Sequence, residues 1–310
     1  MIIDLKAAIS LILSGEVVGL PTETVYGLAG DATSITACSK IYEIKQRPLF
    51  NPLIIHVLDI EEAQKYGKFN EDSYKIASKF WPGPLTLILQ KLSSGISEIA
   101  TSNLNTIAIR IPSHPIFREV LKETAKPLAA PSANIAGRIS PTLAEHVNKS
   151  FLGKVPVIDG GKTIYGMEST IVDCSCDVPK ILRYGFISAE VISKNLGKEI
   201  PYESNYKKIK APGSLKKHYA PACNIRINEE LAKPTEVAIN FGPSNLVGAK
   251  SFNLSPMGDL TEAAANLYFL LQKAEDIVRW ENLEGIVVAP IPKEQIGLAI
   301  NDKLERSCAK

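Results

Sequence analysis

The most constraining feature of this chain is a proline-stiffened loop between a helix and a buried strand. Residues 34 to 45 repeat apolar side chains at three- and four-residue intervals, which predicts a helix. Residues 53 to 57 form a short apolar run that is typical of a buried strand. Each of the two prolines between them fixes its own φ angle and restricts the residue before it. A rigid connection therefore separates these two elements.

Lys45, Arg47 and Asn51 belong to this connection. A stiff loop that holds two cations and an amide together is what binding of a polyanion such as a triphosphate requires. The alternative is an ordinary helix-to-strand connection with solvated charges, and a Lys-x-Arg pattern alone favours that alternative. Because both cations are placed on a loop, we expect their truncation to spare folding.

Length, charge and cysteine content set broad limits. A chain of 310 residues suggests about two domains. Its net charge of +2 is far from the strongly basic balance of a dedicated nucleic-acid binder. Five cysteines without a Cys-x-x-Cys pair indicate free thiols in a reducing compartment. With neither a targeting segment nor an apolar run near the ~18 residues that cross a bilayer, the chain is expected in the cytoplasm, away from membranes.

Arg110 closes a strand with clear alternation. Residues 106 to 111 place three isoleucines on one face and Arg110 on the other. Pro112 ends the strand, and α/β proteins usually place their sites at such strand ends. Arg110 therefore either faces solvent or enters a polar cleft as a fork for a carboxylate or phosphate.

Two further loops combine hydroxyl groups with small residues. Residues 21 to 30 are expected to form a turn, in which hydroxyls and a Gly-x-x-Gly either let a ligand approach the backbone or simply cap a strand. Residues 131 to 142 follow a buried strand and suit a backbone nest for anions. Within them, Ser140 and Pro141 resemble the start of a helix whose N-terminus would favour phosphate.

The last third of the chain has a different pattern. Residues 202 to 210 are polar and lead into a distinctive segment that ends at Pro221. Short apolar runs then alternate with a long helical pattern at residues 262 to 280, which predicts a small parallel α/β domain.

Taken in chain order, these motifs resemble one family. The matching stretches span about residues 1 to 200 and are Pro21–Leu28, Lys45-x-Arg47-Pro48, Asn51–Leu53, Trp81–Pro84, Arg110, Pro131–Asn134, Ser140–Thr142, Glu168–Thr170 and Arg183. They look like the YrdC-type threonylcarbamoyl-AMP synthases, and their shared order is more specific than any single motif. Residues 218 to 221 and the additional C-terminal domain resemble the long form of that family.

The resemblance implies an α/β fold in three parts. Residues 1–201 would form a YrdC-like catalytic domain, a twisted mixed sheet with helices around a positive concave site. Residues 202–221 would form a linker or lid. Residues 222–310 would form a smaller, Rossmann-like parallel α/β domain.

The resemblance also implies a nucleotidyltransferase. Such an enzyme condenses L-threonine with bicarbonate or CO2 and ATP, giving threonylcarbamoyl-adenylate and pyrophosphate. The product is the precursor of threonylcarbamoyladenosine next to the tRNA anticodon. The proteins that transfer this group to tRNA are the expected downstream partners, and direct contact with tRNA is not required. A carbamate oxygen would attack the α-phosphate, so the site needs positioning and charge neutralisation without a side-chain nucleophile.

The resemblance also implies which substrate each motif residue binds. ATP would be held by Lys45, Arg47, Asn51, Thr106, Ser132, Ser140, Arg183 and Tyr219. Threonine would be held by Thr24, His56, Arg110, the backbone at Ala130, and Ser169. Mg²⁺ would be carried by the phosphates, with no dedicated metal site in the protein. Tyr219 would close over ATP as a lid or, alternatively, only dock the second domain.

Two other functions remain open at this point. The first is a nucleic-acid-binding module, which the near-neutral charge and the lack of interleaved aromatic residues disfavour. The second is a carbamoyl transferase that uses carbamoyl phosphate. Salt dependence of RNA affinity tests the first, and labelled bicarbonate against carbamoyl phosphate tests the second.

Overall fold

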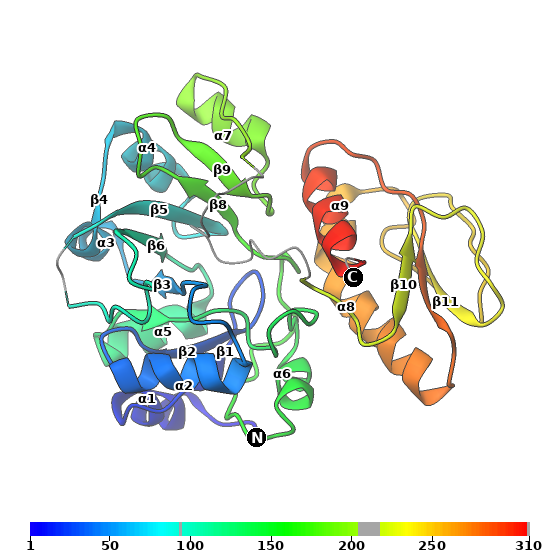
Figure 1. The fold of residues 1–310 in the computed structure, drawn as a ribbon, viewed down its shortest axis with the longest axis horizontal. Coiled ribbons are helices and arrows are strands. Elements are labelled where there is room, and N and C mark those ends of the chain that lie inside the picture. The colour runs from blue at the N-terminus through cyan, green and yellow to red at the C-terminus, as the bar shows by residue number, and fades with distance from the viewer. Residues whose placement is uncertain (93–94, 204–217, 309–310) are drawn as a thin grey trace.

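The structure, a computed structural model, describes residues 1–92, 95–203 and 218–308. Most of the predicted linker, residues 204–217, lies outside the described residues. The described chain builds a large sheet with its helices and then a smaller parallel sheet with two helices (Figure 1).

The first part is organised around one mixed sheet. Its strands are β1 (Val18–Leu20), β2 (Gly27–Asp31), β3 (Ile54–His56), β4 (Gly67–Lys68), β5 (Leu85–Lys91), β6 (Thr106–Arg110), β7 (Leu128–Ala129), β8 (Thr170–Asp173) and β9 (Lys180–Arg183). Their order is β1-β2-β7-β3-β6-β5-β8-β9, with β4 beside β5. Two neighbouring pairs, β3–β6 and β5–β8, are parallel, whereas the other pairs are antiparallel. This confirms the predicted mixed sheet.

Seven described helices accompany this sheet. They are α1 (Leu5–Leu13), α2 (Ile35–Lys45), α3 (Ile60–Tyr66), α4 (Glu71–Phe80), α5 (Pro115–Thr124), α6 (Ala144–Ser150) and α7 (Ala189–Leu196). The helix predicted before the cationic loop is α2. Its N-cap is Ser34, whose side chain accepts a hydrogen bond from the Ala37 amide, and it ends where Gln46 adopts a left-handed conformation.

Parallel pairing of β3 with β6 places two predicted site residues next to each other. The register pairs His56 with Arg110 at the end of both strands. Ile55 and Ile109 are fully buried in the main core beneath them. Arg110 therefore extends from a strand end over a packed sheet, as the alternating sequence predicts.

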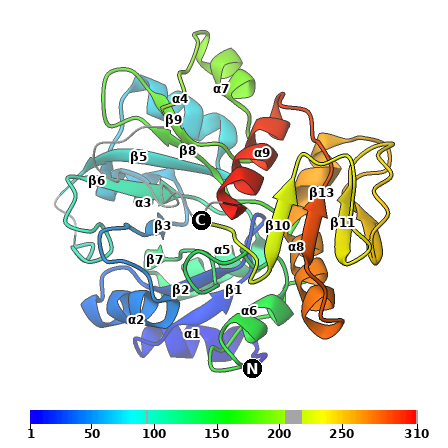
Figure 2. The same cartoon turned by 45° about the vertical axis from the view of Figure 1, so that its right-hand side comes forward.

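The second part is a parallel sheet, as predicted, and it has four strands. Its strands are β10 (Asn224–Ile227), β11 (Glu236–Asn240), β12 (Lys250–Asn253) and β13 (Gly285–Val288), in the order β10-β13-β11-β12. Helices α8 (Leu260–Trp280) and α9 (Ile296–Ser307) lie between this sheet and the first domain (Figures 1 and 2). The side of the second domain that faces the first is therefore helical.

The predicted start of one helix is wrong. The helix predicted to begin at Ser140 is α6, which begins at Ala144 with Leu143 as its N-cap. The Pro141 carbonyl instead accepts a hydrogen bond from the Tyr26 amide at 2.8 Å. The polar stretch around Ser140 is thus tied across to the loop before β2 and does not start a helix. No helix in the described part of the chain is long and apolar enough to cross a membrane.

Candidate active site

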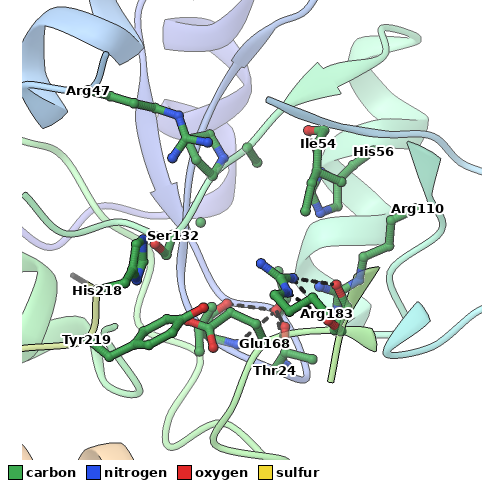
Figure 3. Close-up of a pocket in the computed structure, with 16 residues that line it drawn as sticks. Thr24, Arg47, Ile54, His56, Arg110, Ser132, Glu168, Arg183, His218 and Tyr219 are labelled. Carbon is green, nitrogen blue, oxygen red and sulfur yellow. Dashed lines mark hydrogen bonds between the residues drawn. The ribbon is translucent and has the colours of Figure 1, made fainter. Parts of the chain in front are cut away.

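A cavity of about 40 Å³ lies where strand ends and loops of the first domain meet the segment that follows residue 217 (Figure 3). It is lined by Thr22, Thr24, Val25, Gly27, Arg47, Ile54, His56, Arg110, Ala130, Pro131, Ser132, Glu168, Ser169, Arg183, His218 and Tyr219. A water molecule occupies about 30 Å³ in the liquid. The cavity is therefore too small for a nucleotide unless lining side chains move.

Every residue predicted to bind threonine lines this cavity. They are Thr24, His56, Arg110, Ala130 and Ser169. The Thr24 hydroxyl lies 2.8 Å from that of Thr22, which itself donates to the Val25 carbonyl. The loop after β1 is therefore held by its own hydroxyls, and it presents Thr24 to the strand ends that hold His56 and Arg110.

Arg110 is fixed by Glu23, a residue to which the sequence analysis assigned no role. Arg110 Nη2 lies 2.6 Å from Glu23 Oε1, and both side chains are buried. The other Glu23 oxygen accepts a hydrogen bond from the Ser113 amide. Burial raises the pKa of Glu23, but the Arg110 guanidinium and these hydrogen bonds outweigh burial and lower it. Glu23 is therefore an ionised partner that orients Arg110.

One hydrogen-bond donor of Arg110 is not used by the protein residues that the structure describes. Its Nε is buried and has no acceptor among the residues that the structure describes. A buried donor without a partner is costly unless a ligand supplies the acceptor. Arg110 is therefore suited to receive one oxygen of an anionic ligand in the cavity.

His56 is neutral in this environment. Burial, and then the nearby Arg110 charge, lower the pKa of His56 to about 3. Its Nδ1 lies 3.2 Å from the Ile54 carbonyl. An imidazole with this pKa can exchange hydrogen bonds with a hydroxyl group but carries no charge at neutral pH.

The residues predicted to bind ATP divide into two groups. Arg47, Ser132, Arg183 and Tyr219 line the cavity. Lys45, Asn51, Thr106 and Ser140 are not among the described residues that line it. Thr106 begins β6, at the opposite end of that strand from Arg110.

The cationic loop is buried and hydrogen-bonded to its own backbone. Arg47 donates to the Asn51 carbonyl and side chain and to the Pro52 carbonyl, at 2.7–2.9 Å. Burial lowers the pKa of Arg47 to about 10, so it remains a cation at neutral pH. The alternative of solvated charges is thus wrong for this loop, and Asn51 serves to orient Arg47.

Lys45 does not lie on the loop. It is the last residue of α2, is 1% exposed, and donates from Nζ to the carbonyls of Ser132 and Asn134. The premise that Lys45 lies on a loop is therefore wrong, and we expect its truncation to lower stability, because two buried carbonyls would lose their donor. Lys45 shapes the backbone of the loop after β7, which contributes Ser132 to the cavity.

Arg183 and Ser169 are also joined. The Arg183 guanidinium donates to both the carbonyl and the hydroxyl of Ser169, at 3.0–3.1 Å. That hydroxyl also lies 2.7 Å from the Thr86 hydroxyl. A predicted ATP residue and a predicted threonine residue thus share one hydrogen-bonded unit.

His218 and Tyr219 enter the cavity from the segment between the domains. Tyr219 is 1% exposed, and its ring stacks 5.6 Å from that of Tyr268, while Lys303 Nζ lies 5.3 Å from the ring centre. Neither the Tyr219 hydroxyl nor His218 Nδ1 has a partner among the described residues. Tyr219 therefore contacts both the second domain and the cavity, which leaves both roles predicted for it open.

The side chains that line the cavity are compatible with Mg²⁺ that enters bound to a nucleotide. Nowhere in residues 1–92, 95–203 and 218–308 do three histidine, cysteine, aspartate or glutamate side chains gather in an arrangement that could hold a metal ion. Glu168 is the one carboxylate among the described residues that line the cavity. This donor set fits Mg²⁺ held mainly by phosphate oxygens and water.

Comparisons with known proteins agree with this architecture. Residues 10–185 match the Sua5–YciO–YrdC family, described as telomere recombination, and residues 187–309 match the C-terminal domain of threonylcarbamoyl-AMP synthase. The threonylcarbamoyl-AMP synthase of Pyrococcus abyssi is 35% identical over 98% of this chain and 93% of its own length. That of Bacillus subtilis is 41% identical over 98% of this chain and 92% of its own length.

A solved structure extends the likeness to three dimensions. The crystal structure of P. abyssi Sua5 complexed with L-threonine matches with a TM-score of 0.88 at 33% identity. The match covers 98% of this chain and 94% of that one, so it includes both domains. This chain therefore belongs to the long-form YrdC-type threonylcarbamoyl-AMP synthase family, as its motifs predict.

Proposed function

We propose that this enzyme condenses L-threonine, bicarbonate or CO2, and ATP into threonylcarbamoyl-adenylate, releasing pyrophosphate. Family membership over nearly the whole chain carries the reaction type. The observation in the site that supports it is the gathering of three arginines, hydroxyl groups and a neutral histidine around one cavity. Such a site neutralises phosphates and orients an amino acid.

The three cavity arginines bind different parts of the substrates. Arg110, fixed by Glu23 and with Nε free of a described acceptor, takes the threonine carboxylate. Arg47 and Arg183 neutralise the phosphates, and the α-phosphate is attacked in line by a carbamate oxygen. Mg²⁺ is proposed to enter on the phosphates and would supply further charge neutralisation there.

Burial is part of the mechanism. The mixed anhydride product is readily hydrolysed, so the reaction requires that water be excluded. Tyr219 and His218 line the cavity, and we propose that they exclude water from it. We also propose that the product passes to proteins that transfer the threonylcarbamoyl group to tRNA in the cytoplasm, without this chain having to bind tRNA.

Mass spectrometry tests the reaction directly. The purified chain is incubated with ATP, Mg²⁺, threonine and ¹³C-bicarbonate, and threonylcarbamoyl-adenylate should carry the label. Label entering only from carbamoyl phosphate would assign the chain to the carbamoyl transferases. Absence of any adenylate from either carbon source would contradict the proposed function.

A further inference from the structure

Glu168 is a buried carboxylate at the centre of a cationic cavity. It is 6% exposed and lines the cavity together with Thr24, Arg183 and Tyr219 (Figure 3). Among the described residues, it forms no ion pair within 4.0 Å. A buried charge normally has an oppositely charged partner. The position therefore calls for a cation.

Two hydroxyl groups from different domains hold this carboxylate. Ser140 donates to one of its oxygens, at 2.5 Å. Tyr268 of α8 donates to the other, at 2.7 Å, across the boundary between the domains. Neutral donors fix the orientation of a carboxylate without supplying a positive charge. The second domain thus sets the position of a group that lines the cavity.

The lysines near Glu168 are already engaged elsewhere. Lys45 donates to the carbonyls of Ser132 and Asn134. Lys303 donates to the Tyr184 carbonyl at 2.8 Å and pairs with Asp302 at 2.9 Å. Both lysines interact with Glu168 through their charge, but neither forms an ion pair with it, so a cationic group on a ligand could still bind this carboxylate directly.

The proposed substrates supply one such cation on the amino acid. Threonine carries a carboxylate and an ammonium group, and the three cavity arginines suit only anions. We propose that Glu168, positioned by Ser140 and by Tyr268 of the second domain, receives the ammonium group of the amino-acid substrate. This inference rests on the proposed function. Arg110 then binds the carboxylate of threonine and Glu168 binds its ammonium group. Tyr268 is a positioning residue.

Binding of two ligands to the full-length chain tests the assignment. Calorimetry compares L-threonine with 3-hydroxybutanoate, which has the same carboxylate and hydroxyl but no ammonium group. The wild-type chain should bind threonine at least tenfold more tightly. In Glu168→Gln, threonine affinity should fall tenfold or more, 3-hydroxybutanoate affinity should stay the same, and the affinity for Mg²⁺–ATP should change less than twofold.

Tyr268→Phe separates positioning from packing. The ring that stacks on Tyr219 remains, and only the hydroxyl on Glu168 is lost. The KM for threonine should rise several-fold while the KM for ATP stays constant. Lys149→Met is the matched control, because it removes another contact across the domain boundary, with Asp276, that does not involve Glu168. This control should leave both KM values unchanged.

The outcomes distinguish this inference from the proposed function. A wild-type chain that forms threonylcarbamoyl-adenylate, with Glu168→Gln and Tyr268→Phe binding threonine normally, would overturn the ammonium site alone. Loss of Mg²⁺–ATP affinity in Glu168→Gln with normal threonine affinity would assign the carboxylate to the metal and would also overturn it. Should Glu168→Gln fail to fold, the change in KM of Tyr268→Phe decides. A wild-type chain that makes no adenylate contradicts the proposed function itself.

Discussion

The Nη2 atom of Arg110 lies 2.6 Å from a carboxylate oxygen of Glu23, and both side chains are almost fully buried. Glu23 precedes β2 and Arg110 ends β6, so the pair joins two distant parts of the first domain. Because Glu23 engages only part of the guanidinium, the buried Nε of Arg110 remains available to a ligand.

Arg110→Lys should weaken threonine binding. Lysine keeps the positive charge but cannot contact Glu23 and a substrate carboxylate through one planar fork. The loss of a charge-assisted hydrogen bond should cost about 1.5–3 kcal/mol of binding free energy. Titration calorimetry with threonine measures it. Arg118→Lys is the matched control, since within the described part of the chain its guanidinium donates to the backbone carbonyls of Leu58 and Pro112 and to no carboxylate. Equal threonine affinities in both variants would remove Arg110 from the site.

Lys45→Met should lower stability more than an equivalent change on the surface. The buried Nζ donates to two carbonyls, which would lose their donor at about 1–3 kcal/mol each. Lys40→Met on the same helix removes a partly exposed contact with Glu16 and should cost less than about 1 kcal/mol. Urea unfolding compares the two. Equal unfolding free energies would contradict a structural role for Lys45.

The amino-acid pocket should discriminate against serine only moderately. Serine differs from threonine by one methyl group, which a fitted pocket distinguishes by about 1–3 kcal/mol. The ratio of the two kcat/KM values should therefore lie between roughly 10 and 200. Steady-state kinetics with both amino acids measures this ratio. Equal values would be incompatible with a threonine pocket formed by Thr24, His56 and Ser169.

Elements with strong local signals were predictable from the sequence. The helix expected at residues 34 to 45 is α2, whose start is capped by Ser34 and whose end is marked by the left-handed Gln46. By contrast, the region of β2 was expected to be a turn. Gly27–Asp31 contains two glycines and an alanine, and such small residues do not give the apolar pattern of a buried strand. β12 was missed because it is a partly exposed edge strand without an apolar alternation.

The candidate site was predictable only in part, for a related reason. Family motifs identified residues such as His56 and Arg110, and strand register brings these two together. The roles of Glu23 and Glu168 depend on hydrogen bonds to partners 87 and 100 residues away. Spacing along the chain carries no signal for such pairings, so only the folded structure shows them.

Stability should decrease in mild acid, with a contribution from His146. Burial, and then Lys149, lower the pKa of His146 to about 4, and the ring accepts a hydrogen bond from the Thr142 amide. Below the unfolded pKa of about 6.5, the unfolded chain therefore binds a proton that the folded chain does not. The contribution of His146 is complete above that pH and is lost towards pH 4, at up to about 1.4 kcal/mol per pH unit.

His146→Gln tests this linkage. The variant should show a shallower decrease of unfolding free energy between pH 6.5 and 4.5 than the wild type, because one proton-binding difference has been removed. Urea unfolding at several pH values measures the slope. An identical slope in both proteins would show that His146 titrates normally in the folded state.

Tyr219 provides the test of whether the segment between the domains closes the site. Its ring rests on the second domain, whereas its hydroxyl is buried in the cavity without a described partner. A lid role predicts that Tyr219→Ala admits water and releases more AMP per threonylcarbamoyl-adenylate formed. Tyr219→Phe keeps the ring, so it should not raise this ratio, but ATP binding should weaken by about 0.5–1.5 kcal/mol because the hydroxyl is lost. Chromatography of the nucleotides gives the ratio, and Tyr74→Ala, on the exposed side of α4, is the control. Wild-type AMP release from Tyr219→Ala would limit Tyr219 to docking the second domain.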